Sequence, residues 1–561
     1  MQQDVKEEVT PPAGARPLLA IRDLEVCFGD KAQPVLHRIS FELRQGERVA
    51  IVGQSGSGKS TTVGAVLQLL AGSGRITHGA ILLDGVDLAA AGEAGMRSIR
   101  GRRIGLVPQD PMSNLNPSLK VGAQIVDALA ANGLPGVADR SRAGIRQRAV
   151  ELMTEAGIPD ADRRFGQYPH EFSGGMRQRV LIAIALAGDP DLIIADEPTS
   201  ALDVTVQRQI LNHLQKLVDA RGTSLLFITH DLGLAADRTD RIIVMADGRI
   251  VEQGTPRQIL LDPREDYTRA LVDAAPSVSA ALAPERGHAA GTADAAAGDT
   301  GLPLVTVTNL VKEFRLRGQR GGTVKALNDV SFTVERGTTT AVVGESGSGK
   351  TTVARILLGL ETPTSGEALV RGESITASRG AARRSLRRMV QPVFQDPYGS
   401  LDPTFSIERL IDEPLRIFGI GDRTSRRARV AELLDQVALP RSIAQRRPNE
   451  LSGGQRQRVA IARALAPEPE LLICDEAVSA LDVLVQDQIL ALLADLQERL
   501  GLTYLFITHD LAVVRQIAHK VVVMKSGSVI ECGTADQVFL APSAPYTQEL
   551  LSAIPGAAFA G

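Results

Sequence analysis

The chain has 561 residues, which is more than one hydrophobic core normally holds, so the sequence predicts several domains. Its content of 44% hydrophobic and 23% charged residues is ordinary for a folded protein and excludes a largely disordered chain. A formal net charge of -3 excludes a chain-wide attraction to nucleic acid, and three distant cysteines (Cys27, Cys474 and Cys532) argue against a disulfide framework, a zinc site or an iron-sulfur cluster.

Residues 1–16 predict a flexible N-terminal tail, because they are acidic, contain proline and lack the apolar centre of a signal peptide. No later stretch reaches the roughly 18 uninterrupted apolar residues that a membrane-spanning helix requires. We therefore expect that the chain does not cross a membrane by itself.

After this tail, residues 18–28 (LLAIRDLEVCF) alternate in polarity like a strand, and residues 47–53 (ERVAIVG) form a short apolar run typical of a buried strand. Residues 61–70 (TTVGAVLQLL) then have the spacing of a helix. Between them, residues 53–60 (GQSGSGKS) match the pattern G-x-x-x-x-G-K-[ST] of a phosphate-binding loop. Strand, glycine-rich turn and helix are the context that such a loop requires.

This loop predicts a site for ATP and Mg2+. Glycines let the backbone N–H groups approach phosphate oxygens, Lys59 supplies a positive charge, and the Ser60 hydroxyl can ligate magnesium. The alternative is a tight strand-to-helix turn that binds nothing. The residues that we expect to bind nucleotide are Gly53, Ser55, Gly56, Gly58, Lys59, Ser60 and Thr61.

Three later apolar runs, at 191–197, 224–230 and 241–248, are typical of buried parallel strands separated by helices, so the predicted fold class is α/β. The first run ends in Asp196 and Glu197. Acidic residues there are often helix caps or solvated charges, but beside a phosphate loop Asp196 can reach magnesium and Glu197 can orient or deprotonate the attacking water. Upstream, Ser173, Gly174 and Gly175 precede a basic helix, and a serine hydroxyl, glycine N–H groups and the helix dipole together predict a second anion site.

The second half repeats these landmarks in the same order, which predicts a duplicated domain at 17–274 and 304–561. The segment between them, 275–303, is rich in Ala, Gly and Pro and predicts a flexible linker. In the second copy an apolar run ends in Asp475 and Glu476. The other equivalent residues are Gly344, Ser346, Gly347, Gly349, Lys350, Thr351 and Thr352 in the loop, and Ser452, Gly453 and Gly454 in the second anion site.

Both halves resemble the nucleotide-binding domains of ABC (ATP-binding cassette) proteins over nearly all of their length. The resemblance rests on SGGMRQR and SGGQRQRVAIARAL, on DEPTSALD and DEAVSALD, and on ITHD in each half. PQDPMSNLNP and FQDPYGSLDP, with the late DYTRAL and PYTQEL, are similar to the ATPases of oligopeptide, dipeptide, glutathione and nickel importers, which include fused two-cassette forms. This resemblance implies two tandem P-loop NTPase domains, each with a RecA-like core, an antiparallel β subdomain and an α-helical subdomain.

The resemblance also implies roles for single residues. Phe28 and Phe314 would stack on adenine, Gln109 and Gln395 would touch magnesium, and His230 and His509 would join Glu197 and Glu476 as catalytic residues. The alternatives that stay open are a core aromatic for each phenylalanine, a surface amide for each glutamine and a structural role for each histidine. The implied magnesium ligands are Ser60, Gln109 and Asp196 in the first copy and Thr351, Gln395 and Asp475 in the second. Permeases would dock near Asn114–Pro117 and Gly399–Pro403, and the loops Ser200–Asp203 and Ser479–Asp482, including Asp203 and Asp482, would cross between the domains.

Family geometry is head to tail, so Ser452, Gly453 and Gly454 would close the site of Lys59, and Ser173, Gly174 and Gly175 would close that of Lys350. ATP binding would then drive closure of the two domains. The chain departs from the family pattern at Met176, where Gln is usual and where the second copy has Gln455. Ala477 and Val478 also replace the Pro-Thr of the first copy, but every phosphate, magnesium and base position is filled, so we expect two competent sites.

The resemblance implies an ATP-hydrolysing subunit that powers a peptide importer from the cytoplasmic face of the cell membrane. Its partners would be two transmembrane permeases and an extracytoplasmic substrate-binding protein, without nucleic acid. Glutathione or nickel import stays open as an alternative, as does a soluble two-cassette ATPase acting on ribosomes. The linker, which is nearly devoid of Lys and Arg, disfavours the ribosome because it offers RNA little positive charge.

Overall fold

The computed structural model describes residues 16–29, 33–199, 202–275, 302–315, 322–479 and 481–556. They form two compact units, one built on the described residues of Met1–Leu202 and Gln209–Arg269, the other on those of Asp203–Arg208 and Ala270–Gly561. The predicted tail and linker lie outside the described residues, apart from Arg16, Ala275, Leu302 and Pro303. No helix in the described part of the chain has the length and apolar character needed to span a bilayer.

A mostly parallel sheet forms the centre of the first unit. Among the described residues it has six strands in the order β10-β9-β3-β8-β7-β6, with β10 antiparallel to β9. The central strand, β3, pairs in parallel with β8 and β9, which confirms the predicted α/β class. The bounds are β3 (Arg48–Val52), β6 (Ile104–Val107), β7 (Leu192–Asp196), β8 (Ser224–Thr229), β9 (Arg241–Ala246) and β10 (Arg249–Gly254).

A second, antiparallel sheet carries the alternating segment at the start of this unit. Its order is β2-β1-β4-β5, and the inward side chains of β1, such as Leu19 and Leu24, are fully buried in one core with Ile51 of β3 and Met245 of β9. This sheet therefore packs against the parallel sheet. The bounds are β1 (Leu19–Phe28), β2 (Gln33–Leu43), β4 (Arg75–Leu83) and β5 (Val86–Asp87).

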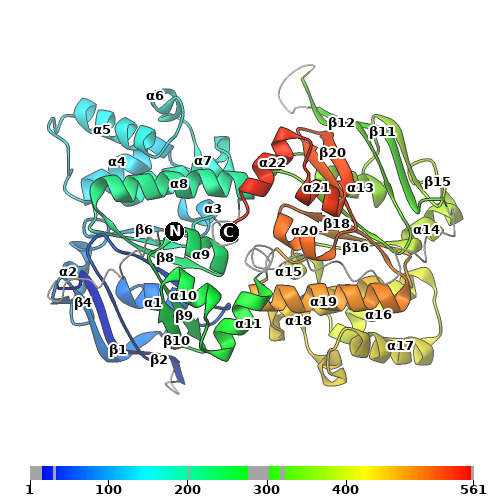
Figure 1. The fold of residues 1–561 in the computed structure, drawn as a ribbon, viewed down its shortest axis with the longest axis horizontal. Helices are drawn as coiled ribbons and strands as arrows, with labels where there is room; N and C mark the ends of the chain where they lie inside the picture. The colour runs from blue at the N-terminus through cyan, green and yellow to red at the C-terminus, as the bar shows by residue number, and fades with distance from the viewer. Residues whose placement is uncertain are drawn as a thin grey trace, which may run out of the picture. The chain divides into compact units, whose positions relative to one another are not determined.

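The helices of the first unit fall into two groups. Helices α4, α5 and α7 pack on one another and form the helical part of the unit, whereas α1 and α9 contact strands of the parallel sheet (Figure 1). The helix bounds in this half of the chain are α1 (Lys59–Val66), α2 (Glu93–Arg97), α3 (Pro111–Asn114), α4 (Val121–Ala131), α5 (Arg142–Glu155), α6 (Ala161–Arg164), α7 (Gly174–Leu186), α8 (Val204–Arg221), α9 (Leu232–Arg238), α10 (Pro256–Leu261) and α11 (Asp266–Ala274). Residues 204–208 of α8 and 270–274 of α11 are counted in the second unit.

The second unit repeats both sheets, as the duplicated sequence predicts. In its described residues the parallel sheet has the order β16-β17-β18-β13-β19-β20, and the antiparallel sheet has the order β12-β11-β14-β15. The strand bounds are β11 (Val305–Arg315), β12 (Thr323–Val334), β13 (Thr339–Val343), β14 (Ser365–Val370), β15 (Glu373–Ser374), β16 (Val390–Val393), β17 (Leu471–Asp475), β18 (Thr503–Thr508), β19 (Lys520–Lys525) and β20 (Ser528–Thr534). The helix bounds are α13 (Lys350–Leu357), α14 (Gly380–Met389), α15 (Pro397–Ser400), α16 (Ile407–Phe418), α17 (Arg423–Gln436), α18 (Gly453–Leu465), α19 (Val483–Leu500), α20 (Leu511–Ile517), α21 (Ala535–Leu540) and α22 (Pro545–Ser552).

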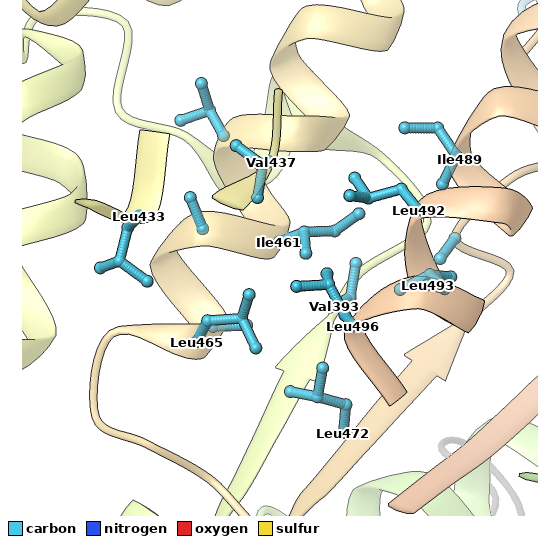
Figure 2. Close-up of a cluster of buried hydrophobic side chains, with 14 of the residues drawn as sticks. Val393, Leu433, Val437, Ile461, Leu465, Leu472, Ile489, Leu492, Leu493 and Leu496 are labelled. Atoms are coloured by element: carbon cyan, nitrogen blue, oxygen red, sulfur yellow. The ribbon is translucent and has the colours of Figure 1, made fainter. Parts of the chain in front are cut away.

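Helix α18 is fixed by apolar contacts on two sides. Figure 2 shows Ile461 of α18 between Leu433 of α17 and the leucines of α19, Leu492 and Leu496, and all four side chains belong to one buried cluster. Burying a side chain of this size stabilises a fold by about 1.5–3 kcal/mol. These contacts hold α18, the helix that follows the second Ser-Gly-Gly segment, in a fixed position.

The helix after the first glycine-rich loop is shorter than the sequence predicts, and its counterpart in the second unit ends at the equivalent residue. The apolar spacing predicts helix through residue 70, but α1 ends at Val66, and α13 ends at Leu357. Gln68 and Gly359 have φ angles of 48° and 64°, in the left-handed region that commonly ends helices. Backbone conformation at one residue therefore overrides the apolar pattern.

Candidate active site

The glycine-rich loop of each unit joins β3 to α1, or β13 to α13, as predicted. Gly53 has a φ of 155°, and a Cβ atom there would lie 2.1 Å from the carbonyl oxygen of Met245. Gly344 is equivalent, with a φ of 146° and the same 2.1 Å approach to the Met524 oxygen. Only glycine fits at these positions because a side chain would collide with the backbone of the neighbouring strand.

The loop lysines are buried and folded back onto their own loops. Lys59 Nζ donates to the Gly53 oxygen at 2.7 Å and to the Gln54 oxygen at 2.8 Å. Lys350 makes the same two contacts, to Gly344 and Glu345, at 2.7 and 2.8 Å. Ser55, Gly56 and Ser60 of the first loop are exposed, as are Ser346, Gly347 and Thr351 of the second. Each loop thus combines an anchored positive charge with an accessible backbone.

A hydroxyl and a carboxylate meet beside each lysine. The Ser60 hydroxyl lies beside Asp196 at the end of β7 and favours the ionised form of this carboxyl, as the Thr351 hydroxyl does for Asp475 at the end of β17. Burial and the neighbouring Glu197 raise the pKa of Asp196 above its usual range. A nearby cation would favour the ionised form of such a carboxylate, and hydroxyl and carboxylate oxygens are the ligands that Mg2+ prefers. The oxygen set therefore fits magnesium.

The glutamate after each aspartate lies at the centre of a polar cluster. The Glu197 carboxylate contacts His230 Nδ1 at 3.2 Å and accepts from Gln109 Nε2 at 3.0 Å. Glu197 itself has a φ of 43°, and its N–H donates to the Ile228 oxygen of β8 at 2.9 Å. The sequence-predicted Gln109, Glu197 and His230, which come from three separate segments, are thus brought together in the first unit.

The second unit repeats this cluster. Glu476 has a φ of 48° and contacts His509 Nδ1 at 3.1 Å and Gln395 Nε2 at 2.6 Å. A residue other than glycine rarely adopts a left-handed backbone, and such strain is concentrated at functional sites. Both copies have the left-handed backbone at this glutamate, which indicates that the conformation serves to place the carboxylate.

The glutamate and histidine change each other's protonation. Burial alone would raise the pKa of Glu197, but the hydrogen bond from His230 and the charges of His230 and Lys59 hold the pKa of this carboxyl below its ordinary value. Burial would lower the pKa of His230, but its hydrogen bond to Glu197 raises it. The pair in the second unit shifts in the same directions. At neutral pH the glutamate is therefore ionised and held by a fixed donor.

The Ser-Gly-Gly segments begin long helices. Ser173 caps α7 by accepting the N–H of Met176 at 3.3 Å, and Ser452 caps α18 by accepting the N–H of Gln455 at 3.3 Å. Only the second cap is reciprocal, because the Gln455 side chain accepts the Ser452 N–H at 3.1 Å and a methionine side chain has no oxygen to do so. Both serines are exposed, with their glycines beside them.

The remaining predicted residues lie at element ends. Phe28 packs against the core of its unit, whereas Phe314 is 39% exposed and has Lys312 Nζ 4.8 Å from its ring centre. Asp203 caps α8 through the N–H of Val206 at 3.0 Å, and Asp482 caps α19 through the N–H of Val485 at 3.1 Å. Ser200, Ala201 and Ala480 of the predicted crossing loops lie outside the described residues.

One contact of the loop is absent from the sequence-based prediction. The hydroxyl of Tyr267 accepts the N–H of Gln54 at 3.1 Å, and the hydroxyl of Tyr546 accepts the N–H of Glu345 at 3.3 Å. These tyrosines belong to the DYTRAL and PYTQEL segments, which served only as marks of resemblance. Their occurrence in both copies is the signal that could have identified them.

Comparison with known proteins agrees with this geometry. The ABC transporter family matches residues 36–200 and 327–479, and the family described as "Oligopeptide/dipeptide transporter, C-terminal region" matches residues 251–300 and 530–559. The chain is 42% identical to the oligopeptide transport ATP-binding protein OppD of Mycobacterium bovis, over 96% of this chain and 98% of that protein. It is also 42% identical to the glutathione import ATP-binding protein GsiA of Escherichia coli K12, over 96% of this chain and 89% of that protein.

Among solved structures, the chain is similar to the ATP-binding cassette MJ0796 in a post-hydrolysis state bound to ADP and Pi. The identity is 31%, the TM-score is 0.38, and the match covers 41% of this chain and 98% of that one. The family match covers both halves, and each half carries a glycine-rich loop with its acidic pair. The chain therefore belongs to the ABC transporter family, as an ATP-hydrolysing protein with two ATP-binding cassettes.

Proposed function

We propose that this chain powers the import of peptides by hydrolysing ATP. The observation that carries this proposal is the match of the oligopeptide/dipeptide C-terminal region in both halves, together with 42% identity to OppD over nearly the whole chain. The equal identity to GsiA supports glutathione import as a second candidate. The comparisons do not support the ribosomal alternative.

We propose that the two loops hold ATP through the residues predicted from the sequence. In the first copy the loop N–H groups and the Lys59 ammonium would bind the phosphates, and Phe28 would stack on adenine. Ser60, Asp196 and Gln109 would hold Mg2+, with Thr351, Asp475 and Gln395 as their counterparts. When bound, Mg2+ would neutralise charge that develops on the phosphate oxygens.

Glu197 and Glu476 would act on the attacking water. A carboxylate that His230 holds in the ionised form is a good hydrogen-bond acceptor, so Glu197 would orient the water and take its proton only as the reaction proceeds. His230 would fix the carboxylate and lie near the γ-phosphate. The same contacts at Glu476 and His509 support an equivalent role for the second pair.

We further propose two domains, 17–274 and 304–561, that close head to tail around ATP. The segment Ser452–Gly454 would complete the site of Lys59, and Ser173–Gly175 would complete that of Lys350. The exposure of both serines, at the start of helices whose N–H groups suit an anion, supports this arrangement. Because ATP would contact both domains, its binding would favour the closed state and its hydrolysis the open one.

The partners would be two transmembrane permeases and an extracytoplasmic substrate-binding protein, with this chain on the cytoplasmic face of the membrane. Met112 in α3 is 64% exposed, and Tyr398 in α15 is 65% exposed, beside the segments predicted to dock permeases. Arg177 of α7 contacts the Met112 sulfur, and Arg456 of α18 lies 3.6 Å from the centre of the Tyr398 ring. Each docking helix would therefore be linked to the helix that follows a Ser-Gly-Gly segment.

The test is transport by the complete system. The chain is reconstituted into proteoliposomes with candidate permeases and a candidate substrate-binding protein from the same organism, and ATP-dependent uptake of a labelled pentapeptide, glutathione and Ni2+ is measured. The doubly substituted Glu197→Gln/Glu476→Gln chain serves as the control without hydrolysis. Peptide uptake that this control lacks supports the proposal.

Uptake of glutathione but not of the peptide would support glutathione import, the second candidate, in place of peptide import. ATP hydrolysis without uptake of any of the three, combined with co-sedimentation of the chain with ribosomes, would overturn the importer function. Association with permeases and association with ribosomes can be told apart, because proteoliposomes and ribosomes separate on a density gradient.

A further inference from the structure

The late helix of each unit contacts the glycine-rich loop of the same unit through one tyrosine. Gln54 N–H donates to Tyr267 Oη at 3.1 Å, across 213 positions of sequence. Glu345 N–H donates to Tyr546 Oη at 3.3 Å, across 201 positions. The contact therefore recurs between segments that tertiary packing, and not local turn geometry, brings together.

This hydrogen bond holds one edge of a peptide group whose other edge is held by the loop lysine. The Gly53 carbonyl accepts from Lys59 Nζ at 2.7 Å, and the N–H of the same peptide group belongs to Gln54 and donates to Tyr267. In a planar trans peptide these two groups point in opposite directions. Rotation of the peptide would break both bonds, so the tyrosine and the lysine fix its orientation together.

The second loop has the same arrangement. The Gly344 carbonyl accepts from Lys350 Nζ at 2.7 Å, and the N–H of that peptide group donates to Tyr546. Lys525 Nζ lies 4.1 Å from the centre of the Tyr546 ring and adds a cation–π contact. Burial raises the pKa of Tyr546 to about 12, so its hydroxyl is uncharged at neutral pH and acts by hydrogen bonding.

The helices that carry the tyrosines are anchored to the sheet edge beside the loop. Glu252 of β10 accepts the N–H groups of Arg264 at 3.0 Å and Glu265 at 3.2 Å, directly before α11. In the second unit Glu531 of β20 accepts the N–H groups of Ser543 and Ala544, at 2.7 and 3.2 Å, directly before α22. Strand β10 pairs with β9, and β20 pairs with β19, the strands whose methionine carbonyls touch the loops.

We propose that Tyr267 and Tyr546 are positioning residues of the two ATP sites. Each fixes the peptide group that holds the loop lysine and thereby raises the affinity of its own unit's loop for ATP. The inference rests on nucleotide binding by the family and not on the transported substrate. It also assigns a task to the late YT segments, which lie within the residues matched by the oligopeptide/dipeptide C-terminal region.

The experiment removes only the two hydroxyl groups, in the full-length chain. For Tyr267→Phe/Tyr546→Phe, the dissociation constant of a non-hydrolysable ATP analogue and the KM for ATP should both rise by about 3- to 10-fold, as expected for one lost hydrogen bond per site. The kcat should change by less than about twofold, because the groups that orient the water are untouched. Calorimetric titration and steady-state phosphate release measure these quantities.

Tyr504→Phe is the matched control. Tyr504 is a buried tyrosine of the second unit whose hydroxyl donates to the Leu493 oxygen at 2.7 Å, and its loss should lower thermal stability without changing affinity for the analogue. Hydrogen exchange of the unliganded chain adds a local measurement. In the single variant Tyr267→Phe, exchange should accelerate in the loop 53–60 and stay unchanged in the loop 344–351.

Unchanged affinity and KM in the double variant, with a loss of stability like that of Tyr504→Phe, would overturn the proposal and leave the tyrosines a structural role only. Unchanged loop exchange in the single variants would also overturn it. A failure of peptide transport in the reconstituted system would leave these binding measurements unaffected.

Discussion

Neutralising the central glutamate of each site should slow ATP hydrolysis by roughly 100-fold or more while ATP still binds. Glu197 has a side chain only 17% exposed, and its carboxylate faces two nitrogen donors, His230 Nδ1 at 3.2 Å and Gln109 Nε2 at 3.0 Å. A glutamine has one oxygen, so its NH2 group faces one of these two nitrogens. Facing Gln109 it loses that hydrogen bond, and facing His230 it exchanges a charge-assisted bond for a weaker one to a neutral imidazole.

A hydrogen bond to a charged group contributes about 1.5–3 kcal/mol, and each 1.36 kcal/mol corresponds to about tenfold in rate. Loss of this bond would slow the reaction by at most roughly 10- to 100-fold, because only the part of its energy that is gained in the transition state affects the rate. Loss of a positioned base contributes about 10²- to 10⁴-fold, so the two estimates overlap near 100-fold.

The assay is steady-state phosphate release by Glu197→Gln, Glu476→Gln and the double variant, with nucleotide retention measured in parallel. Glu47→Gln is a matched control, because the Glu47 side chain is also 17% exposed and pairs with Arg241 at 2.8 Å, at the opposite end of β3 from the loop. The control should hydrolyse ATP normally. Two retained nucleotides per double-variant chain would indicate two competent sites, and one would indicate a degenerate site. Phosphate release by the double variant within about threefold of the unsubstituted chain would refute the role of both glutamates.

Three further predictions concern the cap of α7, the first glycine-rich loop, and Glu252, which holds the segment before α11. Met176→Gln should complete the reciprocal cap with Ser173 and raise the free energy of unfolding by about 0.3–1.5 kcal/mol. Chemical denaturation measures this change, and an unchanged denaturation midpoint would contradict the prediction. Gly53→Ala would place a Cβ atom 2.1 Å from the Met245 oxygen and distort the loop. The affinity for ATP, measured by calorimetric titration, should fall by about tenfold or more. Unchanged affinity would show that the loop can shift to admit the methyl group. Burial opposes ionisation of Glu252, but the backbone N–H groups of Arg264 and Glu265 hold its pKa below the ordinary value of 4.5. The ionised carboxylate therefore stabilises the fold at pH values above 4.5, and this stabilisation is lost as pH falls through the lowered pKa. In Glu252→Gln the free energy of unfolding should consequently fall less steeply with pH below about 4.5. The same pH dependence in the variant and the unsubstituted chain would contradict this.

The parts of each site that adjoin a strand end could be predicted from the sequence. Lys59 follows and Asp196 ends an apolar run typical of a buried strand, and parallel strands bring their carboxyl ends to one edge of a sheet. The α/β class, the parallel strands and the position of the loop are confirmed for this reason. The early end of α1 could not be predicted, because the left-handed conformation of Gln68 leaves no trace in the apolar pattern.

Contacts between distant segments were also beyond the sequence. The recurrence of the YT segments could mark the two tyrosines as candidates, but the bond between Gln54 and Tyr267 depends on how α11 packs against the sheet, which a pattern of residue types does not encode. The absence of a reciprocal cap at Met176 is the opposite case, since a residue without a side-chain oxygen excludes that cap from the sequence alone.

The left-handed backbone at Glu197 and Glu476 has a consequence for protein engineering. A residue with a β-carbon in this conformation costs about 1 kcal/mol, and glycine or asparagine adopts it more easily. This cost is smaller than the contribution of about 1.5–3 kcal/mol from each hydrogen bond to the carboxylate, so glycine at either position would lose more stability than it gains. A more heat-resistant form of this ATPase should therefore keep both glutamates, and stabilising substitutions are better sought outside the two sites.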